Sequence, residues 1–164
     1  MFLENKMAGE PATDARNQMQ CVTFELDHET YGINVMQVQE VLRETEVAPV
    51  PGAPHYVIGI INLRGNVVSV IDARIRFGLS TIERTEMTRI IVIEAQQQII
   101  GILVDSVAEV VDVKLSEIET APNVGNDESS RYIDGVVSRS DNLLILIDLD
   151  KLLSQEEWGS ISNM

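Results

Sequence analysis

The sequence has few of the residues that mark the common specialised protein classes. Its 164 residues include one cysteine, two histidines, one tryptophan, and 12 lysines and arginines against 26 aspartates and glutamates. A single cysteine excludes an intramolecular disulfide framework. The formal net charge of −14 repels nucleic-acid backbones and anionic lipid surfaces at long range. Nucleic-acid binding is therefore disfavoured.

Long apolar runs are also lacking. Uninterrupted aliphatic runs such as IIGILV at 99–104 fall far short of the roughly 18 apolar residues that a membrane-spanning helix needs. The N-terminus, MFLENKMAGE, carries acidic residues instead of a basic end followed by an apolar stretch, so we expect a cytoplasmic protein. Residues 1–19 show no sustained hydrophobic period and predict a mobile tail. Residues 159–164 are expected to form a short C-terminal tail.

Short runs rich in valine and isoleucine, separated by turn residues, dominate the chain from residue 21 onward. This pattern predicts an all-β fold made of many short strands, as in small barrels or a sandwich. The candidate strands are 21–27, 31–35, 55–63, 67–72, 88–95, 99–107, 108–114, 132–139 and 143–148.

Three segments predict helices. Residues 35–42 place Val35, Val38, Val41 and Leu42 at helical spacing. Residues 72–78 have Asp72 as a candidate N-cap and Gly78 as a stop. Residues 148–159 have Asp148 as the corresponding cap, Gly159 as a stop and good helix formers between them.

The sequence also contains an internal duplication. YGINVMQVQEVL at 31–42 aligns with IGILVDSVAEVV at 100–111, and YVIGIINLRGNVVSVID at 56–72 aligns with YIDGVVSRSDNLLILID at 132–148. The second copy carries a longer polar connection, residues 116–131, which predicts an exposed loop. Because each half would bury little surface alone, we expect two related β lobes that share an apolar seam.

The residues that match between the copies have structural interpretations. Asp72 and Asp148 each close a strand before a helical turn and are interpreted as caps instead of general bases. Gly59 and Gly135 lie inside strand patterns and predict bulges or tight bends. The structural residues predicted from the duplication are Gly32, Gly59, Asp72, Gly101, Gly135 and Asp148.

Catalytic and cofactor motifs are missing from the sequence. No HExxH, GxSxG or phosphate-binding glycine loop occurs, and His28 and His55 fall at predicted turns. Asp148 and Asp150 are explained by capping instead of by a metal. Cys21 has no basic sequence neighbour that would favour a thiolate. We therefore expect neither enzymatic activity, nor a cofactor, nor a metal.

Arg64 is the strongest candidate for a binding residue. It sits at the predicted tip of the turn NLRG, and five of the nine arginines fall between residues 64 and 89. Two interpretations remain open from composition alone. Arg64 is either an anchor for a partner or a solvated side chain that balances nearby carboxylates.

Four segments together resemble the CheW-like chemotaxis adaptor family. They are FELDHETYGINVMQVQEVL, GIINLRGNVVSVIDARIRFG, IIGILVDSVAEV and YIDGVVSRSDNLLILIDLDKLL, in the family's order and with compatible spacing across about residues 20–154. The resemblance implies two intertwined, SH3-like five-stranded β barrels around a shared seam, with a CheW-like domain over residues 20–158 and a short C-terminal helix.

The resemblance also implies a function. Proteins of this family are non-catalytic scaffolds that couple transmembrane chemoreceptors to the histidine kinase CheA in membrane-associated signalling arrays, with possible self-association. It implies a receptor-contacting surface at Arg64, Asn62, Val38 and Glu40, and a kinase-contacting loop at Glu119, Asn123 and Val124. The alternatives are an adaptor of another CheA-type pathway such as surface motility, an oligonucleotide-binding barrel, or a barrel enzyme acting on a small ligand.

Overall fold

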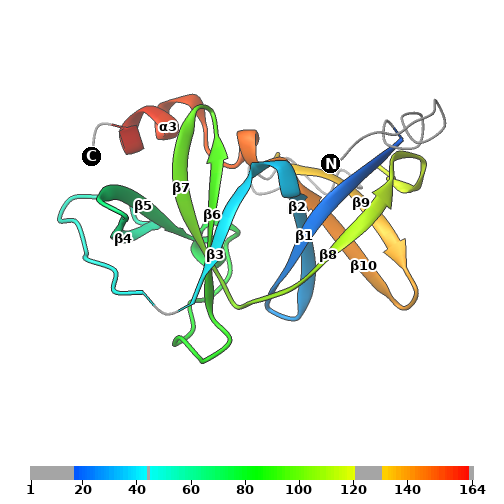
Figure 1. The fold of residues 1–164 in the computed structure, drawn as a ribbon, viewed down its shortest axis with the longest axis horizontal. Coiled ribbons are helices and arrows are strands. Elements are labelled where there is room, and N and C mark those ends of the chain that lie inside the picture. Colours follow the sequence, from blue (N-terminus) through cyan, green and yellow to red (C-terminus); the bar gives the residue numbers. More distant parts are fainter. Residues whose placement is uncertain (1–16, 44, 121–130, 163–164) are drawn as a thin grey trace.

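In the described part of the chain, ten strands form two five-stranded sheets, which confirms the all-β prediction (Figure 1). The computed structural model describes residues 17–43, 45–120 and 131–162. The strands are β1 (Gln18–Leu26), β2 (Glu29–Asn34), β3 (Val38–Leu42), β4 (Val57–Leu63), β5 (Asn66–Asp72), β6 (Arg89–Ala95), β7 (Gln98–Val104), β8 (Ser106–Lys114), β9 (Ile133–Arg139) and β10 (Asn142–Ile147). The helices are the 3₁₀ turns η2 (Val35–Gln37), η3 (Leu115–Glu117) and η5 (Leu149–Lys151), and the α-helices α2 (Ala73–Arg76) and α3 (Gln155–Ser162).

Each sheet builds one lobe, and each takes strands from both halves of the chain. Lobe A is the sheet β8-β1-β2-β10-β9, and lobe B is the sheet β3-β6-β7-β5-β4. The pairs β2–β10 and β5–β7 are parallel, and the other neighbours are antiparallel. In the order given, every strand of lobe A has a counterpart in lobe B. The two sequence copies are therefore intertwined, as expected, and neither copy forms a lobe by itself.

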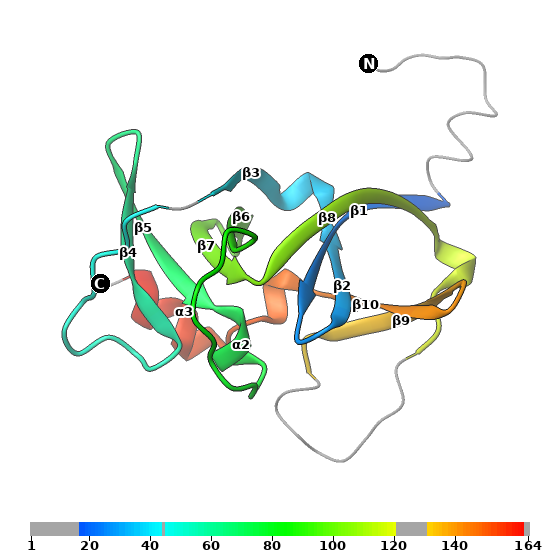
Figure 2. The ribbon, with the colours of Figure 1, turned by 90° about the horizontal axis from the view of Figure 1, so that it is seen from below.

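Two isolated β-bridges bring the edges of each sheet together. Ala48 and Ile60 exchange backbone hydrogen bonds of 2.9 and 2.8 Å, and Glu119 and Val136 exchange bonds of 2.8 and 2.9 Å. The bridges link the segment after β3 to β4 and the segment after β8 to β9. Each sheet therefore curls into an open barrel (Figure 2).

Gly59 and Gly135 permit these bridges, as predicted for residues at bends. A Cβ atom on Gly59 would lie 2.3 Å from the carbonyl oxygen of Ala48, and Gly59 has a φ of +152°. A Cβ on Gly135 would lie 2.9 Å from the carbonyl oxygen of Glu119. The register of β4 and of β9 also shifts beside each glycine, as a β-bulge requires.

The largest buried cluster lies between the two sheets and confirms the predicted apolar seam. It contains residues from both lobes and from α3, among them Trp158 and Ile161. Smaller clusters fill the interior of lobe A, around Cys21 and Leu146, and that of lobe B, around Val70 and Val92. A chain of aromatic contacts crosses the seam, with ring centroids 4.6 to 5.6 Å apart, from Phe24 through Tyr31 and Phe77 to Tyr132.

The helix predicted at residues 35–42 is wrong. Only Val35–Gln37 forms a 3₁₀ turn, capped by the Asn34 side chain, and Val38–Leu42 is the strand β3. The turn and a bulge at Gln39 break the two-residue alternation of a strand. The resulting spacing of the valines imitates the period of a helix.

The two predicted caps are confirmed. The carboxylate of Asp72 accepts hydrogen bonds from the backbone N–H groups of Arg74 and Ile75 at the start of α2, and that of Asp148 accepts one from Asp150. The predicted helix at 148–159 is divided, however, into η5 and α3. Gly159 does not stop α3, which continues to Ser162 because Ile161 is buried in the seam.

The predicted ends of the domain also differ from the structure. Gln18 and Met19 belong to β1 instead of a tail. Residues 1–16 and 163–164 lie outside the described residues, as do residues 121–130 of the predicted exposed loop. Within the described part of the chain, no helix is long and apolar enough to cross a membrane.

Candidate partner-binding surface

Arg64 occupies the first central position of the two-residue turn between β4 and β5. Its φ is +52° and that of Gly65 is +87°, the paired left-handed conformations of a type I′ hairpin turn. The side-chain oxygen of Asn62 accepts a hydrogen bond of 2.9 Å from the Gly65 N–H. Asn62 therefore stabilises the turn that presents Arg64.

Glu40 lies on β3, directly after a bulge. Val38 pairs with Ile93 and Glu40 pairs with Val92, so Gln39 is an extra residue on β3. The same irregularity recurs in lobe A, where the register between β1 and β8 shifts at the matching place. A bulge changes the direction of the side chains that follow it. Here Glu40 lies within hydrogen-bonding reach of the Arg64 turn.

Arg64 and Glu40 form a bidentate ion pair. The two guanidinium nitrogens donate to the two carboxylate oxygens at 2.6 and 3.1 Å. Glu40 comes from β3 and Arg64 from the β4–β5 turn, which lie at opposite edges of the sheet of lobe B. The pair exists because the sheet curls. The Arg64 side chain is 73% exposed and that of Glu40 is 25% exposed, so the pair contributes about 0 to 1 kcal/mol to stability.

The strand that carries Glu40 also carries apolar side chains. Val38 packs partly against the shared seam, Val41 is exposed, and Met36 in the preceding turn is 86% exposed. The amides of Gln37 and Gln39 donate to Glu94, at 3.2 and 3.1 Å. β3 therefore carries accessible apolar groups on the face of Ile91 and Ile93 and one member of the ion pair, Glu40, on its other face. Such a combination suits partner binding.

The predicted site residues are only partly brought together. Arg64, Asn62 and Glu40 form one hydrogen-bonded group, and Val38 lies two residues from Glu40 on β3. Glu119 is exposed on lobe A, where its backbone bridges to Val136. Asn123 and Val124 lie outside the described residues.

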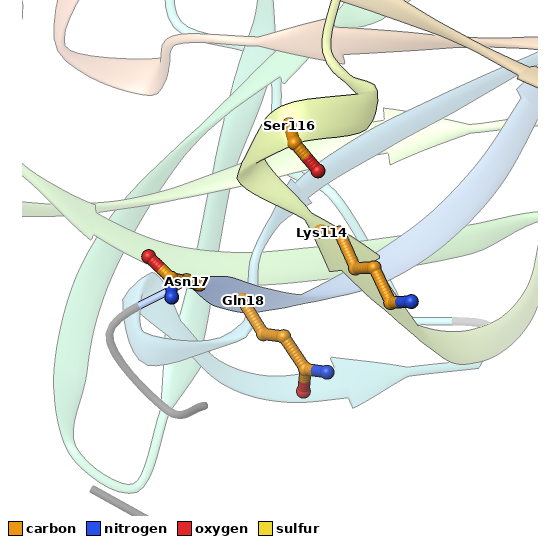
Figure 3. A pocket seen from close by; sticks show the side chains of 4 residues that line it. All are labelled: Asn17, Gln18, Lys114 and Ser116. Atoms are coloured by element: carbon orange, nitrogen blue, oxygen red, sulfur yellow. The ribbon is translucent and has the colours of Figure 1, made fainter. Parts of the chain in front are cut away.

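Another hollow of the described surface, of about 430 Å³, lies where β1 begins beside the end of β8 and is lined by Asn17, Gln18, Lys114 and Ser116 (Figure 3). These residues provide one cation and three neutral polar groups. Within 17–43, 45–120 and 131–162, no group of three histidines, cysteines, aspartates or glutamates is placed to hold a metal. Burial raises the pKa of the Cys21 thiol to about 11 and disfavours the thiolate.

Two of the five clustered arginines are not surface residues. Arg74 and Arg76 follow the Asp72 cap, and both are largely buried in ion pairs with Asp105 and Glu157. The sequence pattern grouped both arginines with Arg64 and did not single out their carboxylate partners. The signal that could have indicated their burial is their position in a short helix directly after the Asp72 cap, where the buried strand β5 ends.

Comparisons with known proteins agree with this architecture. The family model described as the CheW-like domain matches residues 20–157. The chain is 32% identical to chemotaxis protein CheW of Klebsiella aerogenes, covering 98% of this chain and 93% of that protein. It is 36% identical to chemotaxis protein CheW of Bacillus subtilis, with coverages of 85% and 89%. The crystal structure of the scaffolding protein TtCheW from Thermoanaerobacter tengcongensis matches with a TM-score of 0.77 and 33% identity, over 85% of this chain and 94% of that one.

Proposed function

The chain belongs to the CheW-like domain family of chemotaxis adaptors, and we propose that it couples chemoreceptors to a CheA-type histidine kinase through the surface around Arg64 and Glu40. In this proposal the protein catalyses no reaction. It works at membrane-associated receptor arrays, where it holds two other proteins together. The observation that carries the proposal is the exposed, bidentate Arg64–Glu40 pair beside the apolar face of β3.

The chemistry of this surface suits the cytoplasmic tip of a receptor, a helical hairpin. An amphipathic helix places its apolar face against accessible apolar groups such as Val38 and Val41, and its polar groups meet the rim. Arg64 has five donors in a planar fork, and Glu40 occupies only one side of it. A carboxylate of the partner would bind the remaining donors of Arg64 and set the orientation of the helix.

Asn62 would support this contact indirectly. Its side chain holds the Gly65 N–H and so keeps the turn in the conformation that places Arg64 against Glu40. Replacing Asn62 would therefore weaken binding without removing a direct contact.

The kinase would bind elsewhere. We assign its contact to the loop that contains Glu119, Asn123 and Val124. The exposure of Glu119 beside its backbone bridge on lobe A supports this assignment. A kinase contact on lobe A would leave the Arg64 surface of lobe B free for a receptor, as an adaptor requires. In this proposal the protein also self-associates within an array, without a surface assigned to that contact.

The test is a reconstitution of a CheA-type kinase with receptor fragments, with and without this protein. Arg64→Ala is compared with Ser140→Ala, because Ser140 occupies the matching turn position of the second copy. We expect Arg64→Ala to weaken receptor binding by about 2 kcal/mol or more, roughly thirtyfold, and to leave folding stability within about 0.5 kcal/mol. Ser140→Ala should bind receptor like the wild type.

Two results would contradict the proposal at different levels. If the wild-type protein binds neither partner and leaves kinase activity unchanged, the adaptor function is wrong. If Arg64→Ala folds normally and binds receptor as tightly as the wild type, only the assignment of Arg64 is wrong.

A further inference from the structure

Helix α2 is only four residues long, yet it supplies two arginines that form ion pairs with different carboxylates, Arg74 with Asp105 and Arg76 with Glu157. Arg74 donates from Nε and Nη2 to the two oxygens of Asp105, at 2.8 and 2.7 Å, and from Nη1 to the carbonyl of Ser80, at 2.8 Å. The Arg74 side chain is 10% exposed. A buried arginine with all these donors engaged is held in one geometry.

Asp105 lies where the chain passes from one lobe to the other. It lies between β7 of lobe B and β8 of lobe A. Its carboxylate also accepts a hydrogen bond of 3.0 Å from the backbone N–H of Asp27, in the β1–β2 turn of lobe A. Its own N–H donates to the carbonyl of Glu25 on β1, at 3.2 Å. Arg74, two residues after the end of β5, is thereby joined to lobe A through this carboxylate, and a second ion pair, of 3.7 Å, links it to Asp27.

Arg76 makes the corresponding connection through α3. Its guanidinium donates to both oxygens of Glu157, at 2.8 and 3.0 Å, and to the carbonyl of Leu152, at 2.9 Å. Arg131, just before β9 of lobe A, donates to the same carboxylate at 3.2 Å. Glu157 thus takes one arginine from α2 and one from the chain entering lobe A.

The Glu157 carboxylate is itself held in place. One of its oxygens accepts a hydrogen bond of 2.7 Å from the Ser154 N–H, and the Ser154 hydroxyl accepts one of 3.1 Å from the Glu157 N–H. This reciprocal pair is a capping box at the start of α3. Phe77, which follows Arg76 in the chain, stacks on Tyr132 with ring centroids 4.6 Å apart.

We infer that α2 fixes the angle between the two lobes, with Asp105 and Glu157 as its two pins and Arg74 and Arg76 as positioning residues. The apolar seam holds the lobes together, but hydrophobic contact is non-directional. Bidentate ion pairs have a defined geometry, and they supply the orientation. The angle in turn sets how the part of the proposed receptor surface around Val38, which packs against the seam, is placed relative to lobe A; this last step rests on the proposed function.

The experiment measures the distance between the lobes directly. Spin labels are attached at Ile99→Cys on β7 and Ser138→Cys on β9, both exposed, in a Cys21→Ala background of the full chain. Distance distributions are recorded for Arg74→Gln, Asp105→Asn and Glu157→Gln. Arg89→Gln is the matched control, because Arg89 donates only to the carbonyls of Glu86 and Thr88 within the described part of its own lobe.

We expect a broadened and shifted distance distribution in the three pin variants and an unchanged one in Arg89→Gln. Receptor-tip affinity should fall by the factor by which the population of the competent angle falls, about tenfold if one molecule in ten keeps it. Arg74→Gln leaves the partly buried Asp105 without its arginine partner, so this variant is the most prone to unfold. If it does unfold, the distance distributions of Asp105→Asn and Glu157→Gln provide the test.

The outcomes separate this inference from the proposed function. Folded pin variants with an unchanged distance distribution would overturn the inference. A broadened distribution with unchanged receptor affinity supports the role of α2 and contradicts a receptor contact at Val38 that depends on the position of lobe A.

Discussion

The hairpin turns at residues 62–65 and 138–141 occupy the same place in the two lobes and differ in what they carry. Both follow a bulged strand whose glycine permits a bridge, and both lead into a strand that ends at a capping aspartate. Only the turn in lobe B presents an exposed arginine. In lobe A the arginine is Arg139, one position earlier, and it donates to the carbonyl of Asp112. The bulge glycines and the capping aspartates recur in both copies, whereas the exposed arginine occurs in one turn only and is free to serve a partner.

The largest expected effect tests whether the recurring features are structural. Gly59→Ala places a Cβ against a backbone oxygen at an unfavourable φ, and we expect a loss of about 3 to 5 kcal/mol in the free energy of unfolding. Gly135→Ala should cost less, because the nearest atom, 2.6 Å away, is in the Ile118 side chain, which has some freedom to shift. Urea denaturation measures both. Equal and small losses would show that the bridges are not constrained by these glycines.

A second prediction concerns Asp105, whose counterpart in the first copy is the exposed Met36. Partial burial tends to raise the pKa of Asp105, but hydrogen bonds from Arg74 and the Asp27 N–H outweigh it and lower the pKa. A lowered carboxyl pKa gives stability that is present above the unfolded pKa, near 3.9, and is lost as the pH falls through the folded value.

Asp105→Asn should therefore be less stable than the wild type at pH 7 by about 1 to 3 kcal/mol, and the difference should shrink below about pH 4. Urea unfolding across this range measures it. Glu157 also has a lowered pKa, and burial raises the pKa of Asp72. Both residues are present in the wild type and in the variant, so their contributions to the pH dependence of stability cancel to first order when the two proteins are compared. A difference that is constant with pH would contradict the assigned role of the Asp105 charge.

The two caps should differ by a smaller amount. Asp72 is buried and accepts from two backbone N–H groups, whereas Asp148 is half-buried and accepts from one. We expect Asp72→Ala to cost about 1 to 2 kcal/mol and Asp148→Ala about 0.5 to 1 kcal/mol in unfolding free energy. Asn variants, which also cap, serve as controls. A larger loss for Asp148→Ala would reverse the ranking.

The smallest effect is expected at the feature that occurs once. Glu40→Gln breaks the ion pair with Arg64. Because the pair is exposed, we expect the free energy of unfolding to fall by less than about 1 kcal/mol, with a correspondingly small fall in the melting temperature. Calorimetry at low and high salt provides the check. A loss of several kcal/mol would mean that the pair holds lobe B closed and is not available to a partner.

The duplication could be predicted because two stretches of each copy align without gaps, and the caps because a capping side chain bonds to the backbone only two or three residues further on. The aligned copies contain the glycines and aspartates that the bridges and helix starts require, and these residues lie where the structure needs them. The resemblance supplied the intertwined barrels. The residues alone did not reveal how the copies exchange strands, because the parallel pairs β2–β10 and β5–β7 join segments far apart in the chain.

The errors arose where two local signals competed. Val35, Val38, Val41 and Leu42 follow a helical period only because a 3₁₀ turn and a bulge interrupt the strand. Gly159 disfavours a helix by about 1 kcal/mol relative to alanine, but burial of Trp158 and Ile161 outweighs that cost. The burial of Arg74 and Arg76 could not be predicted, because their carboxylate partners lie 31 and 81 residues away and give no local signal.

The exchange of strands between the halves has a consequence for how such a chain could originate. A single ancestral half has the sequence of a complete unit but not its sheet, since β1 and β2 need β8, β9 and β10, and these come from the other half. Two copies of that half could satisfy one another only by swapping strands as a symmetric dimer. In the present chain both halves lie in one polypeptide, so each sheet is completed without a second molecule. The two halves need not be identical, and only one of the two matching turn positions carries an arginine.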